Sequence, residues 1–303
     1  MKERFFFLTN DVETTSLWNH CLSDETGYKV WKEGMPQLLD LYEKYNIKST
    51  FFFTGYIAKL YPEIVKMILP FGHEVGCHGL VHDSRKAFDV LSLTDQIMHL
   101  QEAKNILEDI CGEEVISFRA PAIRVNNRTP IALAKTGFHI DSSIASQRLD
   151  FIFSFGIQHK LTWLFSPRKP YFSSKKKLSR KGNSNIMEFP INAIILPYIG
   201  TLMRISPFCT SIVRTLLNIE NYLNETPVSF IIHPNELIEE AIHKYPIKRR
   251  AKNYLSYLLD DKIKLKNLGE KAIPLLEEQL KYFSERNYSF VTLKEYYLNK
   301  SYK

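Results

Sequence analysis

The stretch FFFLTNDVETTS, residues 5–16, joins a run of large apolar side chains directly to polar and acidic ones. The apolar part is typical of a buried strand. The residues that follow, above all Asp11 and Glu13, have two interpretations. Asp, Thr and Ser favour turns and helix caps, which is a structural explanation. A functional explanation requires partners for the two carboxylates at the ends of other strands.

The overall composition predicts a folded protein that contains a large core. The chain has 303 residues, of which 45% are hydrophobic and 13% aromatic, so a folded chain is expected rather than a disordered one, as one large domain or two smaller ones. Its four cysteines are scattered without a CxxC pair, which argues against a disulfide framework and a cysteine-based zinc module. We see no secretory signal and no apolar run long enough to span a bilayer, and therefore expect a cytoplasmic protein.

Short β-rich runs alternate along the chain with longer amphipathic periods. Amphipathic helices are expected around 57–68, 97–110 and 273–283. Continuous apolar strands that alternate with helices indicate a parallel sheet with helices on its outer face, and at this length a β/α barrel is the economical solution. A Rossmann fold is the weaker alternative, because no GxGxxG follows a strand. The expected strands are 4–9, 49–54, 74–77, 115–118, 186–189, 228–232 and 288–291.

One region, about residues 150–218, departs from this alternation. Residues 168–181 carry seven basic side chains and no acidic one, and residues 189–218 contain only two charges, Arg204 and Arg214. One interpretation is a basic surface loop followed by a core strand, a linker and a helix. The other is an insertion in a single domain over 1–303 that rests on an anionic membrane surface. Nucleic-acid binding is not expected, because the basic segment lacks interleaved aromatic side chains and a known reading motif.

Histidines are crowded in the segment GHEVGCHGLVHDS, residues 72–84. His78 and His82 have the i, i+4 spacing that places two imidazoles on one side of a helical turn, and they follow a short strand-like run. A third ligand is needed for a catalytic metal site with one open position. Asp11 or Glu13 can supply it, and the other acid is then free to act as a general base.

Three further polar side chains each follow a strand-like run. They are Arg119 after VISF, Asp141 after GFHI and His233 after VSFII. Each alone has an ordinary structural explanation, namely a surface ion pair, a helix cap and a core histidine. Together with the acids and histidines above, they match the catalytic rim expected at the carboxyl ends of barrel strands.

These motifs, in this order, resemble those of the polysaccharide deacetylase family, the NodB-homology domain of carbohydrate esterase family four. The resemblance covers residues 4 to about 234 and implies an α/β fold, a distorted (β/α) barrel, with metal-dependent removal of an acyl group, usually acetyl from an amino sugar. The motifs that carry it are TNDVE (9–13), HGLVH (78–82), FRAPA (118–122), IDSS (140–143) and FIIHP (230–234).

The resemblance also implies roles for single residues. Asp11 resembles the catalytic base, and Arg119 the arginine that orients it. His233 resembles the general acid. Asp141 resembles the acid that supports that histidine. His78 and His82 resemble the metal-binding histidines.

The first motif departs from the family pattern TFDDG. Val12 stands where the family places its second aspartate, which is ordinarily the metal ligand. We expect Glu13 to take its place as the third ligand, beside His78 and His82, with Asp11 as the base; ligation by Asp11 is the alternative. Two nitrogens and one carboxylate favour zinc among divalent metals.

The expected function is therefore the deacetylation of an N-acetylated sugar, as a lipid-linked precursor in surface polysaccharide synthesis. The expected partner is a carbohydrate that carries an N-acyl group, with a peripheral contact at the inner face of the membrane as a further expectation. Two alternatives are a deformylase of a formamido sugar and an inactive, glycan-binding scaffold barrel. The sequence does not fix the oligomeric state.

Overall fold

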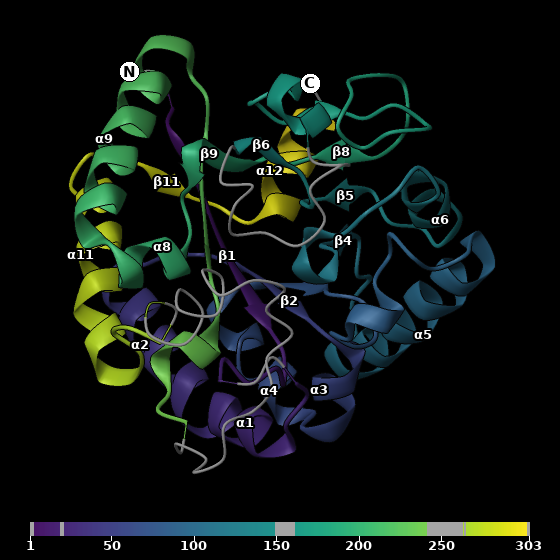
Figure 1. Ribbon diagram of the computed structural model, residues 1–303, viewed down its shortest axis with the longest axis horizontal. Helices are drawn as coiled ribbons and strands as arrows, with labels where there is room; N and C mark the ends of the chain where they lie inside the picture. Colours follow the sequence, from purple (N-terminus) through teal and green to yellow (C-terminus); the bar gives the residue numbers. More distant parts are fainter. Residues whose placement is uncertain (1–2, 19–20, 149–160, 241–262, 264, 302–303) are drawn as a thin grey trace.

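The computed structural model describes residues 3–18, 21–148, 161–240, 263 and 265–301. Its centre is a curled sheet with the order β10-β1-β2-β3-β4-β5-β8-β7, and β11 pairs with β1 (Figure 1). All pairings in this sheet are parallel except that between β7 and β8, as the alternation of strands and helices predicted. The strands are β1 (Phe5–Val12), β2 (Thr50–Phe53), β3 (Glu74–Cys77), β4 (Ser117–Phe118), β5 (Ile140–Asp141), β6 (Ala145–Arg148), β7 (Tyr171–Phe172), β8 (Met187–Glu188), β9 (Ile191–Pro197), β10 (Val228–Ile232) and β11 (Ser289–Phe290).

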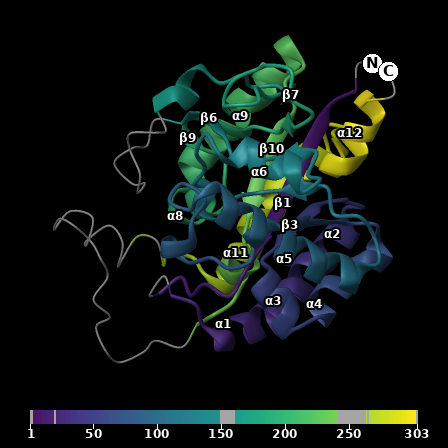
Figure 2. The same ribbon diagram turned by 90° about the vertical axis from the view of Figure 1, so that its right-hand side faces the viewer.

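Helices pack against the outside of this sheet, and the view turned by 90° shows them around it (Figure 2). The longest are α5 and α9, which begin at serine caps, Ser92 and Ser206. The helices are α1 (Asp24–Lys29), α2 (Met35–Lys44), α3 (Gly55–Leu60), α4 (Glu63–Lys66), α5 (Leu93–Cys111), α6 (Thr129–Lys135), α8 (Gly200–Ile205), α9 (Pro207–Asn224), α11 (Ala272–Ser284) and α12 (Leu293–Ser301).

Alternation along β1 separates the core from the site. Phe6, Leu8 and Val12 belong to the large apolar cluster that the outer helices share. Phe7 belongs to a smaller cluster on the other side of the sheet, with Phe52. Because side chains in a strand alternate between two faces, Asp11 lies on the same face as Phe7. The apolar run therefore buries both faces of the strand, and its inner face ends on a carboxylate.

Two sequence expectations differ from the structure in detail. The single amphipathic helix expected over 57–68 is divided into α3 and α4, because Pro62 lacks an amide hydrogen and begins a new helix. The first strand also continues beyond Thr9 to Val12, so Asp11 is held within β1. The extended backbone fixes the direction of this carboxylate.

The described part of residues 150–218 packs on the barrel. β8 pairs with β5, and β9 is tied to β10 by the side chains of Asn192 and Ser229, which bond to each other's backbone amides over 2.6 and 2.9 Å. This arrangement agrees with the interpretation as a loop, core strand, linker and helix. Residues 150–160 of the expected insertion lie outside the described residues. None of the described helices is long and apolar enough to cross a membrane.

Candidate active site

Two carboxylates meet where β1 ends. Asp11 and Glu13 are two residues apart in extended chain, so both side chains leave the strand on the same face. Both are almost completely buried, with 5% and 6% exposure. The negative charges therefore lie in a region of low dielectric, where positive partners have a large effect.

His78 and His82 approach these carboxylates from the loop that follows β3. The predicted helical turn is wrong: residues 78–82 form an irregular loop. Gly79 has a φ of +72°, and a Cβ there would lie 3.2 Å from the ring of Phe88, so the loop requires glycine. The sharp turn at Gly79 replaces the helix in bringing the rings together, and their centroids are 5.9 Å apart.

The orientation of His78 is fixed by the neighbouring strand. Its Nδ1 lies 2.9 Å from the carbonyl oxygen of Arg119, to which it donates a proton, so that Nε2 carries the lone pair. Burial lowers the pKa of His78, and it lowers the pKa of His82 to about 4. Both rings are therefore neutral near pH 7, which is the form that binds metals.

Glu13, His78 and His82 fit a divalent metal ion. One ligand atom from each lies within 4.8 Å of the other two. Oε2 of Glu13 is buried without a hydrogen-bond partner among the described residues, and it lies 3.5 Å from Nε2 of His82. Burial raises the pKa of Glu13, so the carboxylate gains from a cation at this position. A bound ion would give Oε2 of Glu13 the positive partner that it lacks among the described residues. Two imidazoles with one carboxylate are a common donor set for zinc.

Asp11 is held by Arg119, which follows β4. Nη1 of Arg119 donates to Oδ1 of Asp11 and to Oγ1 of Thr9, both over 2.8 Å. Its other nitrogens donate to the backbone oxygen and the hydroxyl of Ser142, and the guanidinium lies over the ring of Phe52. Burial alone would raise the pKa of Asp11, but the charge of Arg119 outweighs it and lowers the pKa below its usual value. Oδ2 of the ionised carboxylate faces the site.

His233 stands on the other side of Asp11, directly after β10. Its Nε2 lies 3.8 Å from Oδ2 of Asp11, and its Nδ1 lies 3.8 Å from Oε2 of Glu236. Burial disfavours the charged ring, but the negative charge of Glu236, with those of Asp11 and Glu13, outweighs it and raises the pKa of His233 to about 9. The ring is therefore protonated near neutral pH and can act as a proton donor.

Glu236 is itself fixed by a buried ion pair. Its Oε1 accepts from Nε and Nη2 of Arg204 over 3.1 and 2.9 Å and from the hydroxyl of Thr201 over 3.0 Å. Burial would raise the pKa of Glu236, but the charges of Arg204 and His233 lower it to about 2. We did not predict either residue. A glutamate three residues after His233 and an arginine inside an apolar segment were the available signals.

The structure does not place Asp141 where the resemblance implied. Its carboxylate accepts from the hydroxyl of Ser143 over 2.7 Å, and it is hydrogen-bonded to Glu188. The cause is register: Asp141 pairs with Glu188 across parallel strands, which directs both side chains to the same face. The carboxylates that contact His233 are Asp11 and Glu236, so Glu236 has the position that we expected for Asp141.

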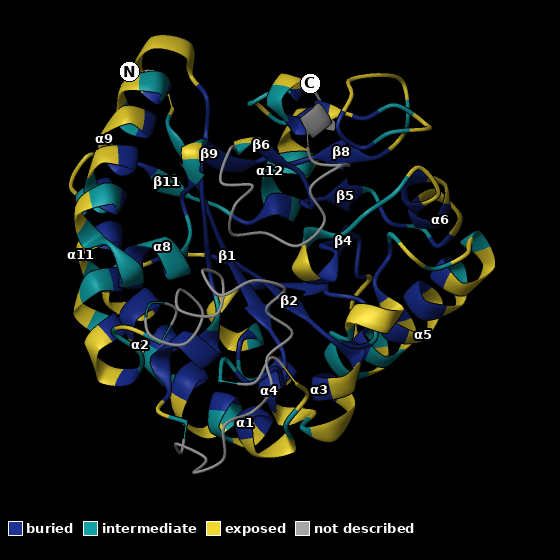
Figure 3. Cartoon of the chain, viewed as in Figure 1, coloured by how far each residue is buried: buried dark blue, intermediate teal, exposed yellow. Residues whose placement is uncertain are grey.

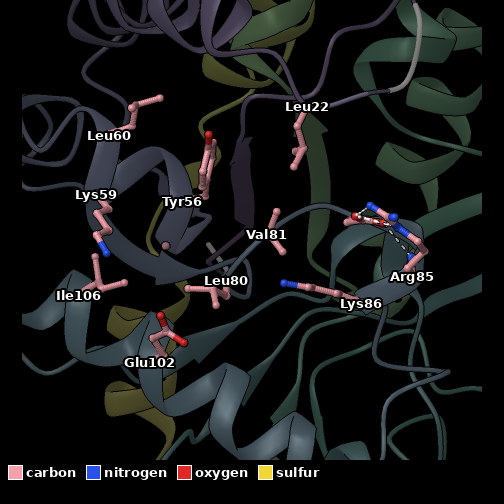
Figure 4. A pocket seen from close by; sticks show the side chains of 12 residues that line it. Leu22, Tyr56, Lys59, Leu60, Leu80, Val81, Arg85, Lys86, Glu102 and Ile106 are labelled. Carbon is pink, nitrogen blue, oxygen red and sulfur yellow. Dashed lines mark hydrogen bonds and ion pairs between the residues drawn. The ribbon is translucent and has the colours of Figure 1, made fainter.

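A pocket of about 670 Å³ lies beside the histidine loop (Figure 4). Leu80 and Val81, which lie between the two histidines, form part of its wall. The size is typical of small-molecule sites. Its other lining residues are Leu22 before α1, Gly55, Tyr56, Lys59 and Leu60 from α3, Asp83, Arg85 and Lys86 from the loop, and Glu102 and Ile106 from α5.

Comparisons with known proteins support the family. Residues 22–140 match the family model described as polysaccharide deacetylase. The chain is 33% identical over 111 residues to a peptidoglycan deacetylase from Helicobacter pylori, a match that covers 37% of each chain. It is 43% identical over 92 residues to a peptidoglycan-N-acetylglucosamine deacetylase from Bacillus cereus, which covers 30% of this chain and 41% of the relative. The chain thus matches about two fifths of the length of these relatives.

Solved structures show the same fold over nearly the whole chain. A Mycobacterium smegmatis protein whose structure carries the family's name superimposes with a TM-score of 0.60 at 18% identity, covering 97% of this chain and 88% of the other. PuuE allantoinase reaches 0.58 at 14% identity, covering 96% and 87%. The predicted distorted (β/α) barrel is confirmed. The match to the polysaccharide deacetylase model spans residues 22–140, which include His78, His82 and Arg119, and it confirms the resemblance over this part of the chain.

Proposed function

We propose that the protein removes the acetyl group from an N-acetylated sugar by metal-dependent hydrolysis. One observation carries the proposal: the Glu13–His78–His82 cluster lies beside an ionised Asp11 and a protonated His233. A base and an acid with opposite protonation states, next to a metal-ligand set, are what amide hydrolysis requires.

Each residue has a definite part in this proposal. Glu13, His78 and His82 would hold a divalent ion, which would act there as a Lewis acid on the acyl carbonyl and lower the pKa of a water. Asp11, oriented by Arg119, accepts the proton of the attacking water on Oδ2. His233 donates a proton to the departing amine, and Glu236 stabilises the imidazolium until then.

Release of acetate from N-acetylglucosamine oligomers tests the activity. We expect Asp11→Asn and His78→Ala to abolish turnover, while Glu239→Gln, which changes an exposed acid beyond the site, leaves it unchanged. Circular dichroism confirms that each variant is folded. Unchanged turnover in both site variants would refute the proposal. Formate release from a formamido sugar, without acetate release, would favour the deformylase alternative, and a protein without zinc affinity would favour the scaffold.

The pocket supports the finer proposal that the sugar is lipid-linked. Leu22, Tyr56 and Leu60, each exposed by 37–39%, form an apolar part of its wall, and Lys59 and Lys86 also line it. Of the two acids in the lining, Asp83 is paired with Arg85, and Glu102 has no ion pair among the described residues. Such a surface suits an apolar chain that carries a phosphate. The double variant Lys59→Ala, Lys86→Ala should raise the KM for a prenyl-phosphate-linked sugar and leave that for the free sugar unchanged. An equal effect on both substrates would contradict this assignment.

Three related expectations stay predictions: zinc as the metal, a cytoplasmic location and a peripheral membrane contact of the basic segment. Metal analysis of the purified protein tests the first. Retention on vesicles that contain anionic lipid at low salt tests the last.

A further inference from the structure

The outward face of α9 is largely apolar, with Thr215 as an exposed polar residue among its apolar side chains. Its large exposed apolar side chains recur at intervals of three or four residues, apart from the adjacent pair Tyr222 and Leu223, which places them on one side of a helix (Figure 3). They are exposed by 41–75%, whereas the opposite face, including Val213 and Leu217, is buried in the core. We call this set the α9 face: Phe208, Ile212, Leu216, Ile219, Tyr222 and Leu223.

The side chains of the α9 face are all uncharged, although the guanidinium of Arg4 lies 5.5 Å from the centre of the Tyr222 ring. The helix has only two charged residues, and each turns away into an ion pair. Nη1 of Arg214 lies 2.9 Å from Glu278 of α11, and Glu220 binds Arg168. A patch of this kind on a protein with a net charge of +7 is a surface on which another molecule can pack without repulsion.

The area fits a second protein surface. A fully exposed large apolar side chain presents on the order of 150–200 Å², so six at these exposures present roughly 600 Å². That exceeds most apolar patches of monomeric proteins. Two such faces in contact bury roughly 1,200 Å², which reaches the range of specific interfaces.

We propose that the α9 face binds the same face of a second copy of this chain, so that two α9 helices pack across a two-fold axis. The spacing 212, 216, 219, 223 alternates steps of four and three residues, as in helices that pack side by side. An anionic membrane suits the face less well, because α9 has no lysine and its single arginine is buried in an ion pair. A two-fold contact brings together the uncharged side chains of the two α9 faces, with Arg4 beside Tyr222 on each of them.

Sedimentation velocity of the full chain tests this proposal. We expect a species of twice the 35.4 kDa chain mass at micromolar concentration. Leu216→Glu should weaken association by about 100-fold or more, because two carboxylates would be buried face to face. The matched control is Ile131→Glu on α6, where the exposure is 38% against 41% for Leu216; it should leave association unchanged.

A second measurement does not depend on weakening the interface. Leu216 lies near the middle of the α9 face, so Leu216→Cys in a background without Cys21 and Cys209 should form an intermolecular disulfide on mild oxidation. A wild-type chain that stays monomeric up to about 100 µM would overturn the proposal. So would a dimer that Leu216→Glu does not dissociate and Leu216→Cys does not link. Vesicle binding by the monomer that Leu216→Glu abolishes would assign the face to lipid instead.

Discussion

The Glu236→Gln variant removes the negative charge behind His233 and keeps the size of the side chain. The pKa of His233 is about 9, against an ordinary value of 6.5, and Glu236 makes the largest contribution that raises it. The difference corresponds to about 3 kcal/mol in favour of the imidazolium. Without the charge of Glu236, burial lowers the pKa of the ring, and we expect about 7 or less. At pH 8 the protonated fraction then falls from about 90% to about 10% or less.

Histidine NMR titration measures this pKa directly, and the pH dependence of turnover measures its effect. We expect the alkaline limb of the pH–rate profile to move down by about two pH units, with little change in metal affinity. The variant also removes the carboxylate charge that pairs with the buried guanidinium of Arg204, which should lower the free energy of unfolding by about 3–5 kcal/mol. Glu239→Gln, an exposed acid three residues further on, is the matched control. A His233 pKa of about 9 in both variants would refute the reasoning.

Three other predictions concern single contacts. Arg119→Lys keeps the charge but loses the branched donor that binds both Asp11 and Ser142, so kcat should fall about 100-fold without loss of zinc affinity; an unchanged kcat contradicts it. His73 is buried, its Nδ1 accepts from a backbone amide, and burial lowers its pKa to about 4. As pH falls, the unfolded chain protonates His73 before the folded chain does. The free energy of unfolding should therefore decrease between pH 6.5 and pH 4, by at most about 3 kcal/mol. In His73→Leu, urea unfolding should show a weaker pH dependence. Gly79→Ala introduces a side chain at positive φ and should cost about 1–2 kcal/mol and weaken zinc binding, which calorimetry measures.

The positions of the strands could be predicted from the sequence better than the contacts of the side chains at the ends of those strands. β3 and β10 have the expected limits because apolar periodicity and flanking turn residues define strands locally. The meeting of Asp11, Arg119 and His233 was predictable, since parallel strands end on one rim. The contact between His233 and Glu236 was not, because it depends on how the turn after β10 folds back. The contact of Asp141 with Glu188 was not predictable for a related reason: it depends on the register with a strand 47 residues further on.

Loop conformation and the exposure of helix faces could also not be predicted from the sequence. The spacing of His78 and His82 predicts a helical turn. In the structure, the positive φ of Gly79 brings the two imidazole rings together instead. The basic segment 168–181 and the nearly uncharged residues 189–218 suggested a membrane surface, because a sequence alone does not show that one side of α9 is buried in the core. The exposed apolar face of α9 could be recognised only from the structure, which shows that the opposite face of the helix is buried in the core.

The central claim is that Glu13, and not Asp11, completes the metal site. Zinc titration calorimetry on two isosteric variants, Glu13→Gln and Asp11→Asn, tests it most directly. Because Oε2 of Glu13 belongs to the ligand cluster while Asp11 is bound to Arg119, we predict that Glu13→Gln weakens zinc binding by at least about tenfold and that Asp11→Asn leaves it nearly unchanged while abolishing turnover. Loss of zinc affinity in Asp11→Asn, with normal affinity in Glu13→Gln, would contradict the account.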